Sequence, residues 1–116
     1  MRTRKWFFLF VFLFVIQGIS KAQAPVKDPD PQRFQQEIDN FKLWDAKNSY
    51  PNQAILFVGS SSIRFWKSHD AFPNYPVINR GFGGAHISDV QHYYRQVIGK
   101  YHPSIIVFYC GDNDIA

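Results

Sequence analysis

Three short apolar runs constrain the fold of this chain most strongly. They lie at residues 54–58, 76–79 and 105–109, and each is followed by a glycine-rich or polar cluster. The first and third runs are apolar at every position, which is typical of parallel strands that are buried on both faces. Helix-like segments separate the runs. Strand, loop and helix in alternation predict an α/β fold with a parallel sheet covered by helices.

The first helix is expected to begin at residue 31. Asp30 is a favourable N-cap, and Pro31 suits the first helical position. Residues 25–31 are expected to form an extended linker that leads into it, and residues 48–52 are expected to end the helix. Apolar residues at helical spacing predict its buried face, at Phe34, Ile38, Phe41 and either Trp44 or Asp45.

A later helix is expected before the third apolar run. Ser88 and Gln91 have the spacing of a capping box, and Pro103 would end the helix. Its apolar face is predicted at Val90, Tyr94, Val97, Ile98 and Tyr101.

The start of the chain has the order of a secretory signal peptide. Basic residues precede an unbroken apolar block at 7–16, and small residues follow. A membrane-spanning helix needs about 20 apolar residues, so we favour a cleaved leader over an anchor. Residues 1–24 are therefore predicted to be the leader, with cleavage after either Ala22 or Ala24. The protein is expected to be exported, to the periplasm or the medium, without a stable membrane anchor.

Charge and cysteine content exclude other classes of protein. The 13 Lys and Arg against 9 Asp and Glu give a net charge of +4. Four of the basic residues lie in the predicted leader, so the remainder is nearly neutral. No basic stripe suggests a nucleic-acid partner. Cys110 is the only cysteine, lies in an apolar run and is predicted to be a buried, inert thiol.

The three clusters after the apolar runs are expected to meet at one edge of the sheet. They read Gly-Ser-Ser-Ser at 59–62, Gly-Phe-Gly-Gly at 81–84 and Gly-Asp-Asn-Asp at 111–114. Ligands of such sheets bind beyond the carboxyl ends of the strands. Taken singly, the clusters could be a helix cap and two turns. No Gly-Lys-Ser/Thr supports a phosphate loop, and His86 stands where a dinucleotide fingerprint needs glycine.

In order and spacing the clusters resemble blocks I, II and III of the SGNH (GDSL-like) hydrolases. The resemblance covers residues 54–116 and is closest to the branch of platelet-activating-factor acetylhydrolase-like esterases. Gly-x-Asn-Asp after a buried strand is its most specific element. It implies a flavodoxin-like three-layer α/β/α sandwich. Residues 25–116 would then be the N-terminal portion of that domain, ending after the third strand.

The resemblance also implies the roles of individual residues. Ser61 would be the nucleophile, and the Gly84 N–H and the Asn113 side-chain amide would complete an oxyanion hole with the Ser61 N–H. The implied function is a serine ester hydrolase acting on acyl or acetyl esters of carbohydrate or lipid, without metal or organic cofactor. The alternative is a non-catalytic carbohydrate- or lipid-binding module on the same fold.

Two departures from the family pattern bear on activity. Ser60 replaces the aspartate of the family's Gly-Asp-Ser, and we interpret it as a substitute behind the nucleophile. No late Asp-x-x-His is present. Asp89 and His92 have that spacing, but they are expected on the solvated face of a helix. His69, His86 and His102 also lack the expected context. We therefore expect the catalytic histidine to lie outside this chain, and the chain alone to be inactive.

Overall fold

The computed structural model describes residues 24–25 and 27–116. The predicted leader therefore lies outside the described residues, except for Ala24. The described residues contain no helix that is both long enough and apolar enough to cross a bilayer.

Three parallel strands form the sheet in the order β2-β1-β3. They are β1 (Ile55–Gly59), β2 (Val77–Gly81) and β3 (Ile105–Tyr109). Gly59 stands opposite both Gly81 and Tyr109, so the three carboxyl ends are level. This order matches the first three strands of the flavodoxin-like arrangement. The predicted α/β fold with a parallel sheet is confirmed.

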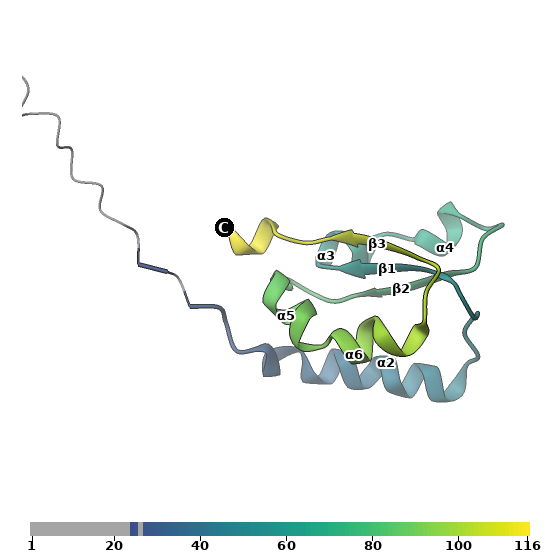
Figure 1. Ribbon diagram of the computed structural model, residues 1–116, viewed down its shortest axis with the longest axis horizontal. Helices are drawn as coiled ribbons and strands as arrows, with labels where there is room; N and C mark the ends of the chain where they lie inside the picture. The colour runs from purple at the N-terminus through teal and green to yellow at the C-terminus, as the bar shows by residue number, and fades with distance from the viewer. Residues whose placement is uncertain (1–23, 26) are drawn as a thin grey trace, which may run out of the picture.

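Helices cover both faces of this sheet (Figure 1). On one side lie η1 (Pro31–Phe34), α2 (Gln35–Lys47), α5 (Ile87–His92), α6 (Tyr94–Val97) and η2 (Gly99–Tyr101). On the other side lie α3 (Ser61–Phe65) and α4 (Ser68–Ala71), and the short η3 (Asp112–Asp114) follows β3. The result is the expected arrangement of three layers.

Alternating side chains of β1 serve the two layers. Leu56 and Val58 are fully buried against α2, α5 and α6. Phe57 points to the opposite face, where its ring centroid lies 5.1 Å from that of Trp66 and 5.7 Å from that of Phe72. Burying each such side chain stabilises the fold by about 1.5–3 kcal/mol.

The first helical segment begins as predicted, and the structure resolves its far end. The Gln32 backbone N–H donates to Asp30 Oδ1 at 2.9 Å. Of the two candidates left open by the sequence, Asp45 faces inward, with its side chain 7% exposed. Trp44 is 61% exposed. The helix therefore turns a carboxylate, rather than an indole, towards the sheet.

Asp45 tolerates burial because it has three partners. Arg80 Nη2 and the Tyr101 hydroxyl each donate to it at 2.5 Å, and Lys100 pairs with it as well. Burial alone would raise the pKa of this carboxyl, but its hydrogen bonds with Lys100 and Tyr101 and the charge of Arg80 lower it. Burial and the neighbouring carboxylate raise the pKa of the Tyr101 phenol. This network connects α2, β2 and η2.

The prediction of a capping box at Ser88 and Gln91 is wrong. His86 is the N-cap of α5, and its backbone N–H donates to Asp89 Oδ2 at 2.8 Å. Asp89 is fully buried and pairs with Arg33 of η1 at 2.5 Å. The expectation of a solvated face therefore fails for Asp89, because η1 packs over α5. His92 is exposed.

The apolar face of the same segment is shifted by one residue at its centre. Tyr93, with φ −93° and ψ 14°, interrupts the helix between α5 and α6. Tyr93 is consequently 1% exposed and the predicted Tyr94 is 53% exposed. The other four predicted positions, Val90, Val97, Ile98 and Tyr101, are buried.

The third strand was expected to be buried, and in the described part of the chain it is not. β3 pairs only with β1 and leaves its other edge without a partner among the described residues. Ile105, Ile106, Phe108 and Tyr109 are each about half exposed. A parallel strand is buried only when helices pack on both of its faces. The described helices pack mainly against β1 and β2, so β3 remains partly exposed.

Candidate active site

Backbone hydrogen bonds join the carboxyl ends of the three strands. The Ser60 N–H donates to the Tyr109 carbonyl at 3.0 Å, and the Phe82 N–H donates to the Gly59 carbonyl at 3.1 Å. Gly59 has φ +146°, and a methyl group there would lie 1.9 Å from the Tyr109 carbonyl oxygen. Only glycine fits this approach. The three clusters therefore lie together, as expected from the order of the strands.

Ser61 is the first residue of α3, directly beyond β1. Ser60, its N-cap, is 1% exposed, whereas Ser61 is half-buried and Ser62 is exposed. Neither the hydroxyl nor the N–H of Ser61 forms a hydrogen bond with the described residues. Both groups remain available to a ligand.

Gly84 and Asn113 lie near each other. A methyl group on Gly84 would lie 3.8 Å from Asn113 Oδ1. Asn113 Nδ2 donates to the carbonyl oxygen of Ala85 at 3.1 Å. A side-chain amide has two protons, so one remains for another acceptor. The Gly84 N–H has no acceptor among the described residues, and Gly84 is exposed.

Two further residues near η3 hold the same loop. Cys110 Sγ donates to the Ala85 carbonyl at 3.2 Å, and the Asp114 carboxylate accepts from the Ile87 N–H at 3.1 Å. Burial raises the pKa of the half-buried Cys110 thiol. A protonated thiol is a poor nucleophile, so the predicted inert role of Cys110 agrees with its surroundings.

No histidine is hydrogen-bonded to Ser61 within the described residues. His69 and His92 are exposed, and His102 precedes β3 at the opposite end of the sheet. His86 Nδ1 lies 3.9 Å from Asp114 Oδ1 and about as far from Asp28. These three side chains are close enough to share a cation. However, Asp28 is 58% exposed, and Asp114 already accepts a backbone hydrogen bond.

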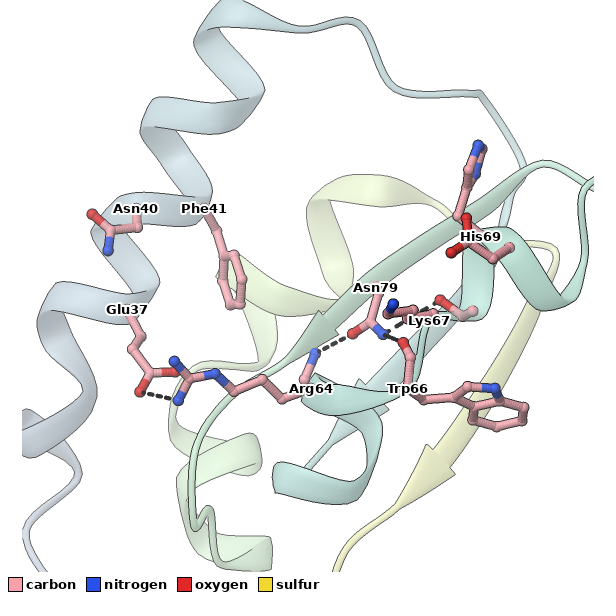
Figure 2. A pocket seen from close by; sticks show the side chains of 11 residues that line it. Glu37, Asn40, Phe41, Arg64, Trp66, Lys67, His69 and Asn79 are labelled. Atoms are coloured by element: carbon pink, nitrogen blue, oxygen red, sulfur yellow. Dashed lines mark hydrogen bonds and ion pairs between the residues drawn. The ribbon is translucent and has the colours of Figure 1, made fainter.

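Two cavities lie next to the strands of the sheet. One of about 570 Å³ lies beside β2, between α2 on one side and α3 and α4 on the other (Figure 2). An apolar pocket of about 270 Å³ lies between Ser62, Trp66 and β3. Neither is lined by Ser61, Gly84 or Asn113. Ser61, Gly84 and Asn113 lie instead at the carboxyl ends of the strands.

Sequence reasoning missed one residue that touches the site. Glu37 of α2 accepts a hydrogen bond from the Gly83 N–H at 3.1 Å and pairs with Arg64 of α3 at 3.2 Å. Gly83 and Glu37 are 46 positions apart, so no local motif connects them. Helical spacing was the one sequence signal for Glu37, because it places Glu37 between Phe34 and Phe41 on the inward face of the helix.

Comparison with known proteins supports the fold. Neither the models of known protein families nor the curated proteins contain a match to this chain. Among solved structures, a Streptococcus pneumoniae protein, described provisionally as a platelet activating factor, is similar with a TM-score of 0.59. The similarity covers 72% of this chain at 22% identity, and the chain spans 40% of the length of that structure. The likeness shows a shared α/β architecture.

Proposed function

We propose that this chain carries the nucleophile and the oxyanion hole of an exported serine ester hydrolase of the SGNH type. The nearness of Gly84 and Asn113, at the sheet edge where Ser61 begins α3, supports the proposal. The Ser61 and Gly84 N–H groups and one Asn113 amide proton have no acceptor among the described residues. An oxyanion hole requires such donors, held in place before the reaction begins.

In the proposed reaction, Ser61 Oγ attacks the carbonyl carbon of an ester. Its proton passes to a histidine, and the carbonyl oxygen becomes an oxyanion held by the three donors. Collapse of this intermediate returns the proton to the departing alcohol and leaves an acyl-enzyme. Water then releases the acid and restores Ser61. We propose that the histidine lies outside these 116 residues.

The substrate class is an acyl or acetyl ester of a carbohydrate or lipid. The resemblance of the three clusters to SGNH esterases supports this class. Export through the predicted leader would place the substrate outside the cytoplasm.

Replacement of the three neighbouring serines in the full-length natural protein tests the proposal. Hydrolysis of p-nitrophenyl acetate should be abolished by Ser61→Ala, which removes the proposed nucleophile. It should be retained by Ser62→Ala, because the exposed Ser62 has no role in the proposed reaction. Activity that survives in Ser61→Ala but disappears in Ser60→Ala or Ser62→Ala would assign the nucleophile to another hydroxyl. A folded wild type that binds carbohydrate or lipid but hydrolyses no ester would establish the binding module instead.

Export is tested separately from catalysis. Residues 1–24 fused to a reporter enzyme that folds only outside the cytoplasm should give activity, which is lost when charged residues interrupt the apolar block at 7–16. Mass spectrometry of the mature amino terminus would decide between cleavage after Ala22 and Ala24. A reporter retained in the cytoplasm would contradict the proposed export.

A further inference from the structure

Glu37 lies on α2, outside the three clusters at the strand ends, yet its carboxylate reaches the loop after β2. Its Oε2 accepts from the Gly83 N–H at 3.1 Å, and its Oε1 accepts from Arg64 Nη1 at 3.2 Å. Figure 2 shows Glu37 and Arg64 extending towards each other from α2 and α3. One carboxylate therefore connects α2, α3 and the loop that carries Gly84.

The ion pair lies directly over Gly83. A methyl group at this position would lie 3.0 Å from Glu37 Oε1 and 3.1 Å from Arg64 Nη1. A side chain at position 83 would require the pair to move by a few tenths of an ångström. Glu37 and Arg64 are 31% and 45% exposed, and ion pairs so exposed contribute little to stability. We therefore interpret the pair as fixing the position of the loop at Gly83, and not as a large contribution to the free energy of folding.

The Gly83 N–H is one residue before the proposed oxyanion donor. On the other side of Gly84, the Ala85 carbonyl is held by Asn113 at 3.1 Å. Two consecutive glycines leave the backbone unusually free to rotate. A charge-assisted hydrogen bond to Gly83 removes much of that freedom. The Gly84 N–H is thus fixed between one anchor from α2 and another from η3.

We propose that Glu37 is a positioning residue for the oxyanion hole, and this inference rests on the proposed function. Glu37 accepts from the Gly83 N–H and so keeps the Gly84 N–H directed at the developing oxyanion. Arg64, through its ion pair, holds the Glu37 carboxylate where it can accept this hydrogen bond. Among the described residues Glu37 forms hydrogen bonds with Gly83 and Arg64 and none with Ser61, so it would act through the loop.

Two substitutions in the full-length protein separate the hydrogen bond from the charge. Glu37→Gln keeps an oxygen acceptor for the Gly83 N–H, whereas Glu37→Ala removes it. With p-nitrophenyl acetate, Glu37→Ala should lower kcat by ~10- to 100-fold with little change in KM, because the misplaced donor acts only after attack begins. Glu37→Gln should recover most of kcat. The matched control is Asp39→Ala, since Asp39 lies on the same helix and pairs only with Gln35 and Lys42 among the described residues.

Amide hydrogen exchange supplies a measurement that does not depend on activity. The Gly83 amide should exchange at least ~10-fold faster in Glu37→Ala than in the wild type, a change of about 1.4 kcal/mol or more in protection. The β1 amides should keep their wild-type rates, which shows that the sheet is intact. Unchanged exchange at Gly83 would show that the contact does not hold the loop.

The two measurements together distinguish the possible failures. An active wild type whose kcat is unaffected by Glu37→Ala would overturn the positioning role and leave the proposed function standing. A wild type that hydrolyses no ester would overturn the proposed function, and the catalytic role of Glu37 with it. Equal loss of kcat in Glu37→Gln and Glu37→Ala would overturn the proposed role of the Gly83 hydrogen bond, because loss of the Glu37 charge alone would then explain the lower kcat.

Discussion

The side-chain amide of Asn113 donates to the carbonyl oxygen of Ala85 at 3.1 Å. One amide proton thus fixes the loop after β2, and the second is directed by the same bond. In the proposed reaction this second proton binds the oxyanion. The amide would then serve both to build the site and to stabilise the intermediate.

Asn113→Ala in the full-length protein should reduce kcat far more than it changes KM. Loss of one oxyanion donor typically costs ~100- to 1,000-fold, or about 3–4 kcal/mol, because the oxyanion exists only after attack. Cys110→Ala is the matched control, since it removes another contact to the same Ala85 carbonyl without removing an oxyanion donor. Steady-state kinetics with a chromogenic acetate ester measure kcat and KM for the wild type and both variants. A defect confined to KM would assign Asn113 to ground-state binding.

Gly59→Ala should destabilise the sheet strongly. The added methyl would lie 1.9 Å from the Tyr109 carbonyl oxygen, at a φ of +146° that alanine rarely adopts. We expect a loss of at least ~2 kcal/mol in the free energy of unfolding by urea. Gly99→Ala is the control, because its nearest neighbour would be a Tyr94 ring carbon at 3.5 Å. Similar unfolding midpoints for the two variants would refute the clash.

Asp45→Asn should make stability less dependent on pH on the acid side. The folded protein holds the pKa of Asp45 below its ordinary value of 3.8, so its stabilising effect is present above that value and is lost as pH falls through the folded pKa. At pH 7 the variant should be less stable by about 3 kcal/mol, because Arg80 would remain buried without its carboxylate.

Urea unfolding at neutral pH and at successively lower pH checks this prediction. The difference between wild type and Asp45→Asn should narrow as pH falls below the ordinary carboxyl pKa. Asp39→Asn, on the exposed side of the same helix, should change stability little at any pH. A difference between wild type and Asp45→Asn that stays constant with pH would contradict the assigned ionisation.

Residues 25–116, expressed alone, should self-associate through β3. Its outer edge has no partner among the described residues, and the strand contains no charge or proline. Most of its side chains are about half exposed. Ile106→Lys, which places a charge on this strand, should reduce association, whereas Phe65→Lys on α3 should not, although Phe65 is 75% exposed. Light scattering over a range of concentrations measures the effect. A wild-type segment that stays monomeric throughout would refute the prediction.

Local sequence was sufficient to predict the strands, but it was not sufficient to predict which residues the helices bury. Residues 105–109 were predicted as a strand, and β3 has those bounds, because an uninterrupted apolar run flanked by turn residues has few alternatives. The choice between Trp44 and Asp45 depended on Arg80, which is 35 positions away. Periodicity left both positions open, and only the tertiary ion pair with Arg80 shows which of them is buried.

The candidate site shows the same division. The order of the strands was enough to predict that the clusters containing Ser61, Gly84 and Asn113 would lie at one edge. The cap of α5 was misplaced by two residues, because His86 and Asp89 form the capping box in place of Ser88 and Gln91. Only the burial of Asp89 beneath Arg33 depends on the tertiary fold. Glu37 was missed for the same reason, since its partner at Gly83 is brought near only by the fold.

The pair formed by Arg33 and Asp89 joins positions 56 residues apart, and this separation has a consequence for biosynthesis. A chain that leaves the ribosome amino end first presents the apolar face of α2 long before α5 and α6 exist. A 13-residue helix is only marginally stable in water, so the segment must stay unpacked during that interval. This early helix is therefore fixed late, and its apolar face is a natural binding site for a chaperone that holds nascent chains.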